Sequence, residues 1–108
     1  MAFIDVAAVD DIPAGAMKPF AVAGKEILIV SHGGSYYAIA RRCPHMGGDL
    51  SKGVLDGTTV TCPRHHSRFD VTNGSCLAGP KIGPLKLSTK DTTRYQVRVE
   101  GRRILVDL

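Results

Sequence analysis

The sequence predicts an all-β fold, an antiparallel β-sandwich or small barrel that carries one inserted lobe at about residues 41–84. Three observations predict it. Apolar and polar residues alternate in several short segments, as they do in half-buried strands. Turn residues, including 12 Gly and 6 Pro among 108 positions, separate these segments. Helical periodicity is weak throughout, so we expect no helical layer.

Tight turns divide the first forty residues into strands. The turn-rich residues 10–15 end the first strand, and Gly24-Lys25 is typical of a tight hairpin. Gly33-Gly34 then turns the chain into a segment in which Tyr and Ile favour a strand. The strands are expected at residues 3–7, 18–23, 26–31 and 35–40.

The middle of the chain has a different composition, because Pro, Gly and His concentrate in residues 41–51 and 63–67. Between these two segments, residues 58–62 predict one short β-branched strand. The Asn-Gly pair at residues 73–74 predicts a hairpin turn, and two Gly-Pro pairs make residues 79–84 a stiff, irregular segment. The sequence thus predicts a loop-rich lobe inserted into a β framework.

The end of the chain predicts a final hairpin. Residues 95–99 alternate apolar and polar, and Gly101-Arg102 leads into the apolar strand 104–106. A chain of 108 residues suffices for one domain with one modest core. We therefore expect a single domain, residues 1–108, with a basal β part at residues 1–40 and 85–108 and a lobe at residues 41–84.

Composition limits the cellular setting. No stretch approaches the roughly 20 apolar residues that a membrane helix needs, and residues 1–5 lack the basic and apolar regions of a secretory signal. We therefore expect no membrane span and a cytoplasmic location. The three cysteines, Cys43, Cys62 and Cys76, are odd in number, which argues against a disulfide framework and favours metal binding or buried thiols.

The formal net charge of +4 comes entirely from the second half of the chain, where residues 55–108 hold nine basic and five acidic side chains. A run of basic residues near the end is most simply a solvated strand face. No aromatic platform is interleaved with it, so the sequence predicts no nucleic-acid binding. The run consists of Lys86, Lys90, Arg94, Arg98, Arg102 and Arg103.

Two short pairs of metal-ligand residues lie in the lobe. They are Cys43-Pro44-His45 and Cys62-Pro63-Arg64-His65, and 16 residues separate His45 from Cys62. A structural zinc site is one reading of two Cys and two His, although the one-residue gap in the first pair is shorter than zinc sites usually have. Cys76 is expected to be a half-buried strand thiol, and His32 an exposed turn residue.

The order and spacing of these pairs resemble the Rieske iron–sulfur signature. The resemblance continues outside the ligands: residues 47–53 resemble the first cluster loop, residues 69–74 resemble the segment after the second loop, and residues 79–85, with Pro80, resemble the loop that covers the cluster. The resemblance implies the Rieske fold and one [2Fe–2S] cluster.

The resemblance also implies how the cluster is held. The thiolates of Cys43 and Cys62 would bind one iron, and the imidazoles of His45 and His65 would bind the other. Such a centre is neutral when oxidised, whereas an all-cysteine cluster carries two negative charges, so the Cys₂His₂ cluster is easier to reduce. The histidine-bound iron would lie at the solvent edge, and the potential should fall at alkaline pH.

Neighbouring positions refine the expected potential. Gly48 and Arg64 stand where Rieske proteins of membrane complexes have two disulfide-linked cysteines, so that disulfide is absent. Ser67 fills the position of a hydroxyl that donates a hydrogen bond to the cluster, but Phe69 replaces a tyrosine and has no hydroxyl. Hydrogen bonds to sulfur stabilise the reduced cluster, so we expect a potential in the lower half of roughly −150 to +300 mV.

Basic residues flank the ligand loops and predict a docking rim. Asp49 is the only acidic residue close to them in the sequence, so the rim should be positive and its redox partners should present an acidic docking surface. His66, where the family commonly has a small residue, either lies beside the cluster or replaces His65 as a ligand. The rim consists of Arg41, Arg42, Arg64, Arg68 and His66.

The function that the resemblance implies is that of a Rieske-type ferredoxin, which carries single electrons from a flavin reductase to a terminal oxygenase and is not itself an enzyme. The alternative is a small subunit or interaction module of a multicomponent reductase, such as nitrite reductase. A catalytic oxygenase would need a mononuclear iron site, for which only His32 and His66 remain. A regulatory redox sensor is neither supported nor excluded.

Overall fold

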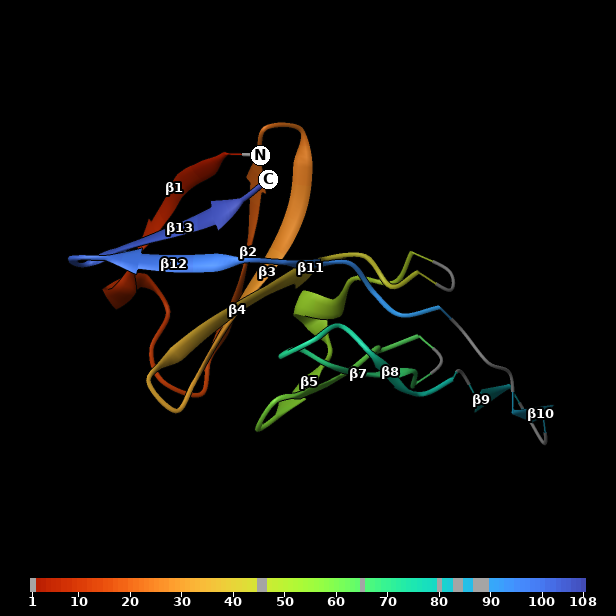
Figure 1. Cartoon of the computed structure of the whole chain (residues 1–108). Helices are drawn as coiled ribbons and strands as arrows, with labels where there is room; N and C mark the ends of the chain where they lie inside the picture. The colour runs from red at the N-terminus through yellow and green to blue at the C-terminus, as the bar shows by residue number, and fades with distance from the viewer. Residues whose placement is uncertain (1, 45–46, 65, 80, 83–84, 87–89) are drawn as a thin grey trace.

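The computed structural model describes residues 2–44, 47–64, 66–79, 81–82, 85–86 and 90–108, and side chains from residue 80 to residue 89 are not described. Within this part of the chain every regular element is a strand except two single-turn 3₁₀ helices (Figure 1). These helices, η1 and η2, are Val9–Asp11 and Leu50–Lys52. The expected all-β class is confirmed.

Two antiparallel sheets form the base of the molecule. One has three strands in the order β1–β13–β12, and the other has four in the order β11–β4–β3–β2. The first sheet comprises β1 (Phe3–Ala8), β12 (Val97–Glu100) and β13 (Arg103–Asp107). The second comprises β2 (Met17–Val22), β3 (Lys25–His32), β4 (Ser35–Ala40) and β11 (Arg94–Tyr95).

The lobe contains a third antiparallel sheet, in the order β5–β6–β7–β8. Its strands have three residues each: β5 (Val54–Asp56), β6 (Thr59–Thr61), β7 (Arg68–Asp70) and β8 (Cys76–Ala78). The sequence predicted only β6 as a strand here, and its predicted Asn73-Gly74 turn lies between the paired strands β7 and β8. Three residues are too few to show an alternating pattern, so only the β-branched β6 was visible in the sequence.

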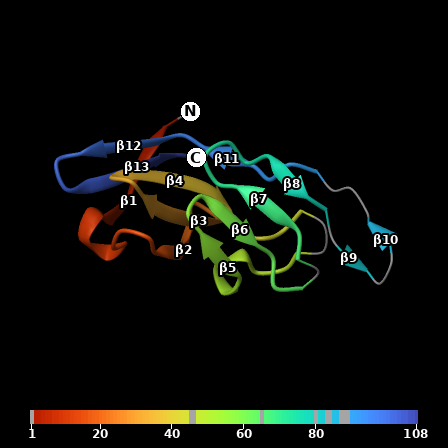
Figure 2. The same cartoon turned by 90° about the horizontal axis from the view of Figure 1, so that it is seen from below.

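The segment expected to be stiff and irregular also contains strands. β9 (Lys81–Ile82) and β10 (Leu85–Lys86) pair with each other as a two-residue antiparallel ladder. They lie at the end of the lobe that is farthest from β1 and β12 (Figure 2). Because Gly-Pro pairs flank β9, the sequence pattern predicted an irregular segment and not this ladder.

Strand β3 is buried on both of its faces. Ile27 and Ile29 pack into the core between the two basal sheets, whereas Leu28 and Val30 pack into a second core beneath the lobe. All four side chains are fully buried. The four-stranded basal sheet is therefore the middle of three layers, and the continuous apolar run in β3 follows from this position.

The second core links the base to the cysteines of the lobe. It consists of Leu28, Val30, Ile39, Cys43, Leu50, Val60, Cys62, Phe69 and Val71. Because the two thiols belong to the same packed cluster as β3 and β4, their positions depend on the base as well as on their own loops.

Hairpin turns set the strand register, and one differs from expectation. Val22 pairs with Lys25, so the central residues of the first turn are Ala23 and Gly24, one position earlier than predicted. Both have positive φ, at 51° and 74°, as a type I′ turn requires. Alanine is unfavourable in that conformation, which is why the sequence pattern pointed one residue further along.

Candidate metal centre

The two cysteine loops of the lobe have the same backbone hydrogen bonds. In the first loop, the Cys43 N–H donates to the Gly48 carbonyl at 2.8 Å, and the Gly47 N–H donates to the Cys43 carbonyl at 2.8 Å. In the second, the Cys62 N–H donates to the Ser67 carbonyl at 2.7 Å, and the His66 N–H donates to the Cys62 carbonyl at 3.1 Å. The two sequence pairs are thus two copies of one turn.

Each turn needs a residue with left-handed backbone four positions after its cysteine. Gly47 has φ 69° and His66 has φ 64° at these equivalent positions. Glycine adopts this conformation without strain, but histidine does not. The structure therefore gives His66 a backbone role in shaping the second loop, which the sequence alone did not reveal.

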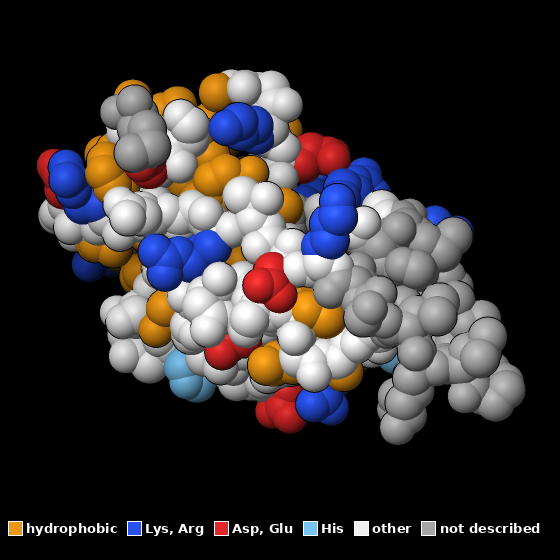
Figure 3. All heavy atoms as spheres, turned by 45° about the vertical axis from the view of Figure 1, so that its right-hand side comes forward, with side chains coloured by type: hydrophobic (Ala, Val, Ile, Leu, Met, Phe, Trp, Pro, Cys, Tyr) orange, Lys and Arg blue, Asp and Glu red, His pale blue; other side chains and the backbone are white. Residues whose placement is uncertain are grey.

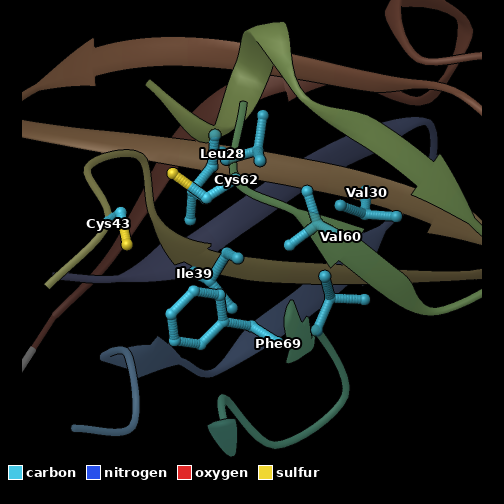
Figure 4. Close-up of a cluster of buried hydrophobic side chains, with 9 residues drawn as sticks. Leu28, Val30, Ile39, Cys43, Val60, Cys62 and Phe69 are labelled. Carbon is cyan, nitrogen blue, oxygen red and sulfur yellow. The ribbon is translucent and has the colours of Figure 1, made fainter. Parts of the chain in front are cut away.

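Both thiols are buried, with Cys43 and Cys62 each only 3% exposed. Figure 4 shows them at one end of the core cluster, beyond Leu28 and Ile39. Gly48 permits the close approach of the two loops, because a Cβ there would lie 2.7 Å from the Cys62 sulfur and 3.2 Å from Arg64 side-chain carbons. A side chain at position 48 would therefore require the Cys62 thiol and the Arg64 side chain to shift.

The hydroxyl of Ser67 lies beside these loops. It is buried, and its oxygen has no hydrogen-bond partner among the described residues. A buried hydroxyl without a partner is costly unless something else accepts its proton. An anionic sulfur acceptor would do so, and two buried thiols with a spare hydroxyl donor therefore fit an iron–sulfur cluster. Such a cluster supplies a one-electron redox couple.

Phe69 lies fully buried in the core cluster and contributes packing rather than a donor. The remaining members of the expected ligand set and its cover, His45, His65 and Pro80, lie outside the described residues. Cys76 is half-buried in β8, as expected, and its backbone N–H donates to the Asp91 carboxylate at 2.8 Å. His32 is exposed at the end of β3.

The charges of the rim are more balanced than the sequence suggested. Arg41 forms a bidentate pair with Asp49, at 3.0 and 2.8 Å, and Asp49 also accepts hydrogen bonds from the N–H and hydroxyl of Ser51. The Arg41 guanidinium and the Ser51 donors hold the pKa of Asp49 well below its usual range. Asp49 thereby also caps η2.

Glu26 is a rim residue that the sequence reasoning missed. It pairs with Arg42 at 3.1 Å and lies 3.8 Å from Arg41, and the hydrogen bond from Arg42 lowers its pKa. The sequence could have predicted this contact, because a hairpin turn centred on Gly33-Gly34 brings residue 26 opposite residue 41. Asp49 is therefore not the only acid at the rim, and the expected positive excess is smaller.

The other rim residues face solvent. Arg64, Arg68 and His66 are exposed. Figure 3 shows basic and acidic side chains interspersed on the face in view, not one continuous basic patch. Three of the six residues in the basic run near the end of the chain also pair with acids: Arg98, Arg102 and Arg103 contact Glu100, Asp10 and Asp5.

No helix among the described residues is long and apolar enough to cross a membrane.

Comparison with known proteins agrees with this centre. The family described as Rieske [2Fe-2S] domain matches residues 2–105. The ferredoxin component of the naphthalene 1,2-dioxygenase/salicylate 5-hydroxylase systems of a Ralstonia species is 37% identical over 98% of this chain and 95% of its own length.

Solved structures give the same result. The ferredoxin of carbazole 1,9a-dioxygenase from Nocardioides aromaticivorans IC177 is 34% identical, with a TM-score of 0.80 over 98% of this chain and 97% of its own. A chain in the complex of reduced oxygenase and oxidized ferredoxin in carbazole 1,9a-dioxygenase is 26% identical, with a TM-score of 0.78 over 96% of this chain and 91% of its own. These relatives are electron carriers rather than catalytic enzymes. The chain belongs to the Rieske [2Fe–2S] domain family, and it is a one-electron carrier that holds one [2Fe–2S] cluster.

Proposed function

We propose that this carrier takes electrons from a flavin reductase and delivers them to the terminal oxygenase of a dioxygenase system in the cytoplasm. The observation that carries the proposal is the match over almost the whole length of both chains to ferredoxin components of such systems. A carrier without a substrate site of its own needs only a cluster, a potential and docking surfaces.

The cluster ligands in this proposal are Cys43, His45, Cys62 and His65. The matched hydrogen bonding of the two cysteine loops supports it, because each sequence pair contributes its buried cysteine from a copy of the same turn. Thiolates on one iron and imidazoles on the other are the arrangement that gives Rieske centres their raised potential. The spare Ser67 hydroxyl supports a cluster sulfur as its acceptor.

The partners in this proposal present acidic docking surfaces. The exposed Arg64 and Arg68, which follow Cys62 and Ser67 in the chain, support it. The pairing of Arg41 with Asp49 and of Arg42 with Glu26 makes the expected attraction modest. Salt should therefore slow association, but less steeply than four unpaired arginines would imply.

The test is reconstitution with the reductase and oxygenase of the Ralstonia naphthalene system. Turnover of naphthalene should depend on this chain, and Cys62→Ser should abolish it. The matched control is Cys76→Ser, which removes a half-buried thiol outside the ligand loops and should leave turnover unchanged. If an intact, reducible protein fails to support turnover, the proposed acceptor is wrong.

A further inference from the structure

The loop between β6 and β7 contains one cysteine of the metal centre and the buried Ser67 hydroxyl (Figure 2). Thr61 and Arg68 form the last pair of the β6–β7 ladder, and the Cys62 N–H then donates to the Ser67 carbonyl at 2.7 Å. Cys62 is 3% exposed and Ser67 is 1% exposed. The two residues face each other where the loop begins and ends, so the contacts that close the loop fix the positions of both.

The loop closes through the backbone of His66. Its N–H donates to the Cys62 carbonyl at 3.1 Å, and its φ of 64° turns the chain so that the next residue, Ser67, bonds to Cys62. Only two non-glycine residues in the described part of the chain have positive φ, and the other is Ala23 in the hairpin between β2 and β3. Strained backbone beside a functional site points to a role in function.

The first cysteine loop shows what this position requires. There the Cys43 N–H donates to the Gly48 carbonyl, and Gly47 has the left-handed conformation with φ 69°. Gly47 is thus the counterpart of His66, and Gly48 is the counterpart of Ser67. The first loop has no side chain at the position where the second loop has its hydroxyl. The left-handed residue of the second loop therefore has an additional effect, because it places a hydrogen-bond donor.

We propose that His66 is a positioning residue whose left-handed backbone holds the Ser67 hydroxyl toward the cluster and thereby sets part of the midpoint potential. The side chain of His66 is exposed, whereas its backbone N–H makes the contact that closes the loop. This inference rests on the part of the proposed function that places the cluster on Cys62. A hydrogen bond from Ser67 to sulfur stabilises the reduced state, so loss of the turn should lower the potential as loss of the hydroxyl does.

Redox titration of the purified protein, followed by EPR, tests this inference without a reductase or an oxygenase. His66→Val should lower the midpoint potential by as much as Ser67→Ala does, because a β-branched residue is strongly disfavoured in the left-handed conformation. His66→Gly and His66→Asn should keep the wild-type potential, because both residues tolerate that conformation. All three variants remove the imidazole, so their comparison isolates the backbone.

A double-mutant cycle shows whether His66 acts through Ser67. The combination of His66→Val with Ser67→Ala should lower the potential no further than either change alone. The matched control is Ala23→Val, which places the same β-branched side chain at a residue with φ 51° outside the cysteine loops. It should lower the melting temperature and leave the midpoint potential unchanged, which separates positioning of the hydroxyl from general loss of stability.

Several results would overturn the proposal. An unchanged potential in Ser67→Ala would remove the group through which His66 is proposed to act, and additive shifts in the double variant would show that the two residues act separately. A potential lowered equally by His66→Gly would assign the effect to the imidazole. An unchanged potential in His66→Val would show that the turn does not place the hydroxyl.

A smaller substitution covers the case in which His66→Val holds no cluster. His66→Ala then decides, because alanine is less disfavoured than valine in the left-handed conformation: a lowered potential supports the proposal and an unchanged potential overturns it. These measurements involve no redox partner. A protein with the expected potentials that supports no turnover would therefore contradict the proposed acceptor and leave the role of His66 intact.

Discussion

Single residues decide the properties of the metal centre, and Ser67 is the clearest case. Its hydroxyl is buried without a partner among the described residues, next in the chain to the exposed Arg68. A hydrogen bond from this hydroxyl to a cluster sulfur would stabilise the reduced, more negative state.

Ser67→Ala should therefore lower the midpoint potential. A hydrogen bond of about 1 kcal/mol corresponds to roughly 40 mV for one electron. Redox titration followed by absorption or EPR measures it. The matched control is Thr92→Val, because Thr92 also has a buried hydroxyl that lacks a partner among the described residues but lies beside Gly74, at the other end of β7. Equal potentials for the wild type and Ser67→Ala would show that Ser67 does not bind the cluster.

Two adjacent glycines in the first loop act for different reasons. Gly47 needs its positive φ, although a Cβ there would meet nothing within 4 Å. Gly48 has no such backbone requirement, but a Cβ there would lie 2.7 Å from the Cys62 sulfur. Gly47 is needed for its backbone conformation, and Gly48 is needed because it leaves space for the Cys62 sulfur.

Gly48→Ala should thus displace the Cys62 thiol and lower the cluster content, whereas Gly47→Ala should keep the cluster and lose only about 1 kcal/mol of stability. Iron and sulfide content of the purified variants, with thermal unfolding of the variant that keeps its cluster, distinguishes the two. A fully loaded Gly48→Ala protein would contradict the proposed position of the cluster against Cys62.

At the scale of elements, the first hairpin contains an alanine in an unfavourable conformation. Ala23 has φ 51°. Asn-Gly, the pair that type I′ turns favour, would adopt this turn with less backbone strain than Ala23-Gly24. The strands on both sides hold the turn in place through six paired positions, from Met17 with Val30 to Val22 with Lys25.

Ala23→Asn should stabilise the protein by about 1 kcal/mol, which for a domain of this size raises the melting temperature by about 4 °C. Ala21→Asn is the matched control, because Ala21 is also exposed but extended within β2, where Asn is disfavoured. A lower melting temperature for Ala23→Asn, with no difference from Ala21→Asn, would contradict the turn assignment.

At the scale of the whole molecule, β3 joins two cores. Leu28 packs against the cluster lobe and Ile27 against the other basal sheet, although both are fully buried neighbours on one strand. The base therefore packs against the cysteines of the lobe with the sheet face that carries Leu28, Val30 and Ile39.

Leu28→Ala and Ile27→Ala should each cost about 2–5 kcal/mol of stability, because each leaves a cavity in a core. Leu28→Ala should in addition speed loss of the visible absorption of the cluster, since its cavity adjoins the core of Cys43 and Cys62. The rate of bleaching, compared at temperatures equally far below each melting point, measures this. Equal bleaching rates would show that the two cores are not independent supports.

Local patterns alone predicted much of this protein. Alternation and turn residues located the longer basal strands, and the strand Ser35–Ala40 was predicted to the residue. The order and spacing of Cys and His carried the resemblance that predicted the family and its cofactor, because such a pattern lies within short segments.

Only the tertiary structure decided the rest. The strands of the lobe sheet are too short to show a period, so their pairing comes from packing Val60 and Phe69 onto the base. The net charge of the docking rim depends on Glu26, which lies 15 residues before Arg41 in the chain and contacts it across a hairpin. Sequence spacing records contacts between near neighbours, whereas charge balance and surface composition depend on which distant residues folding brings together.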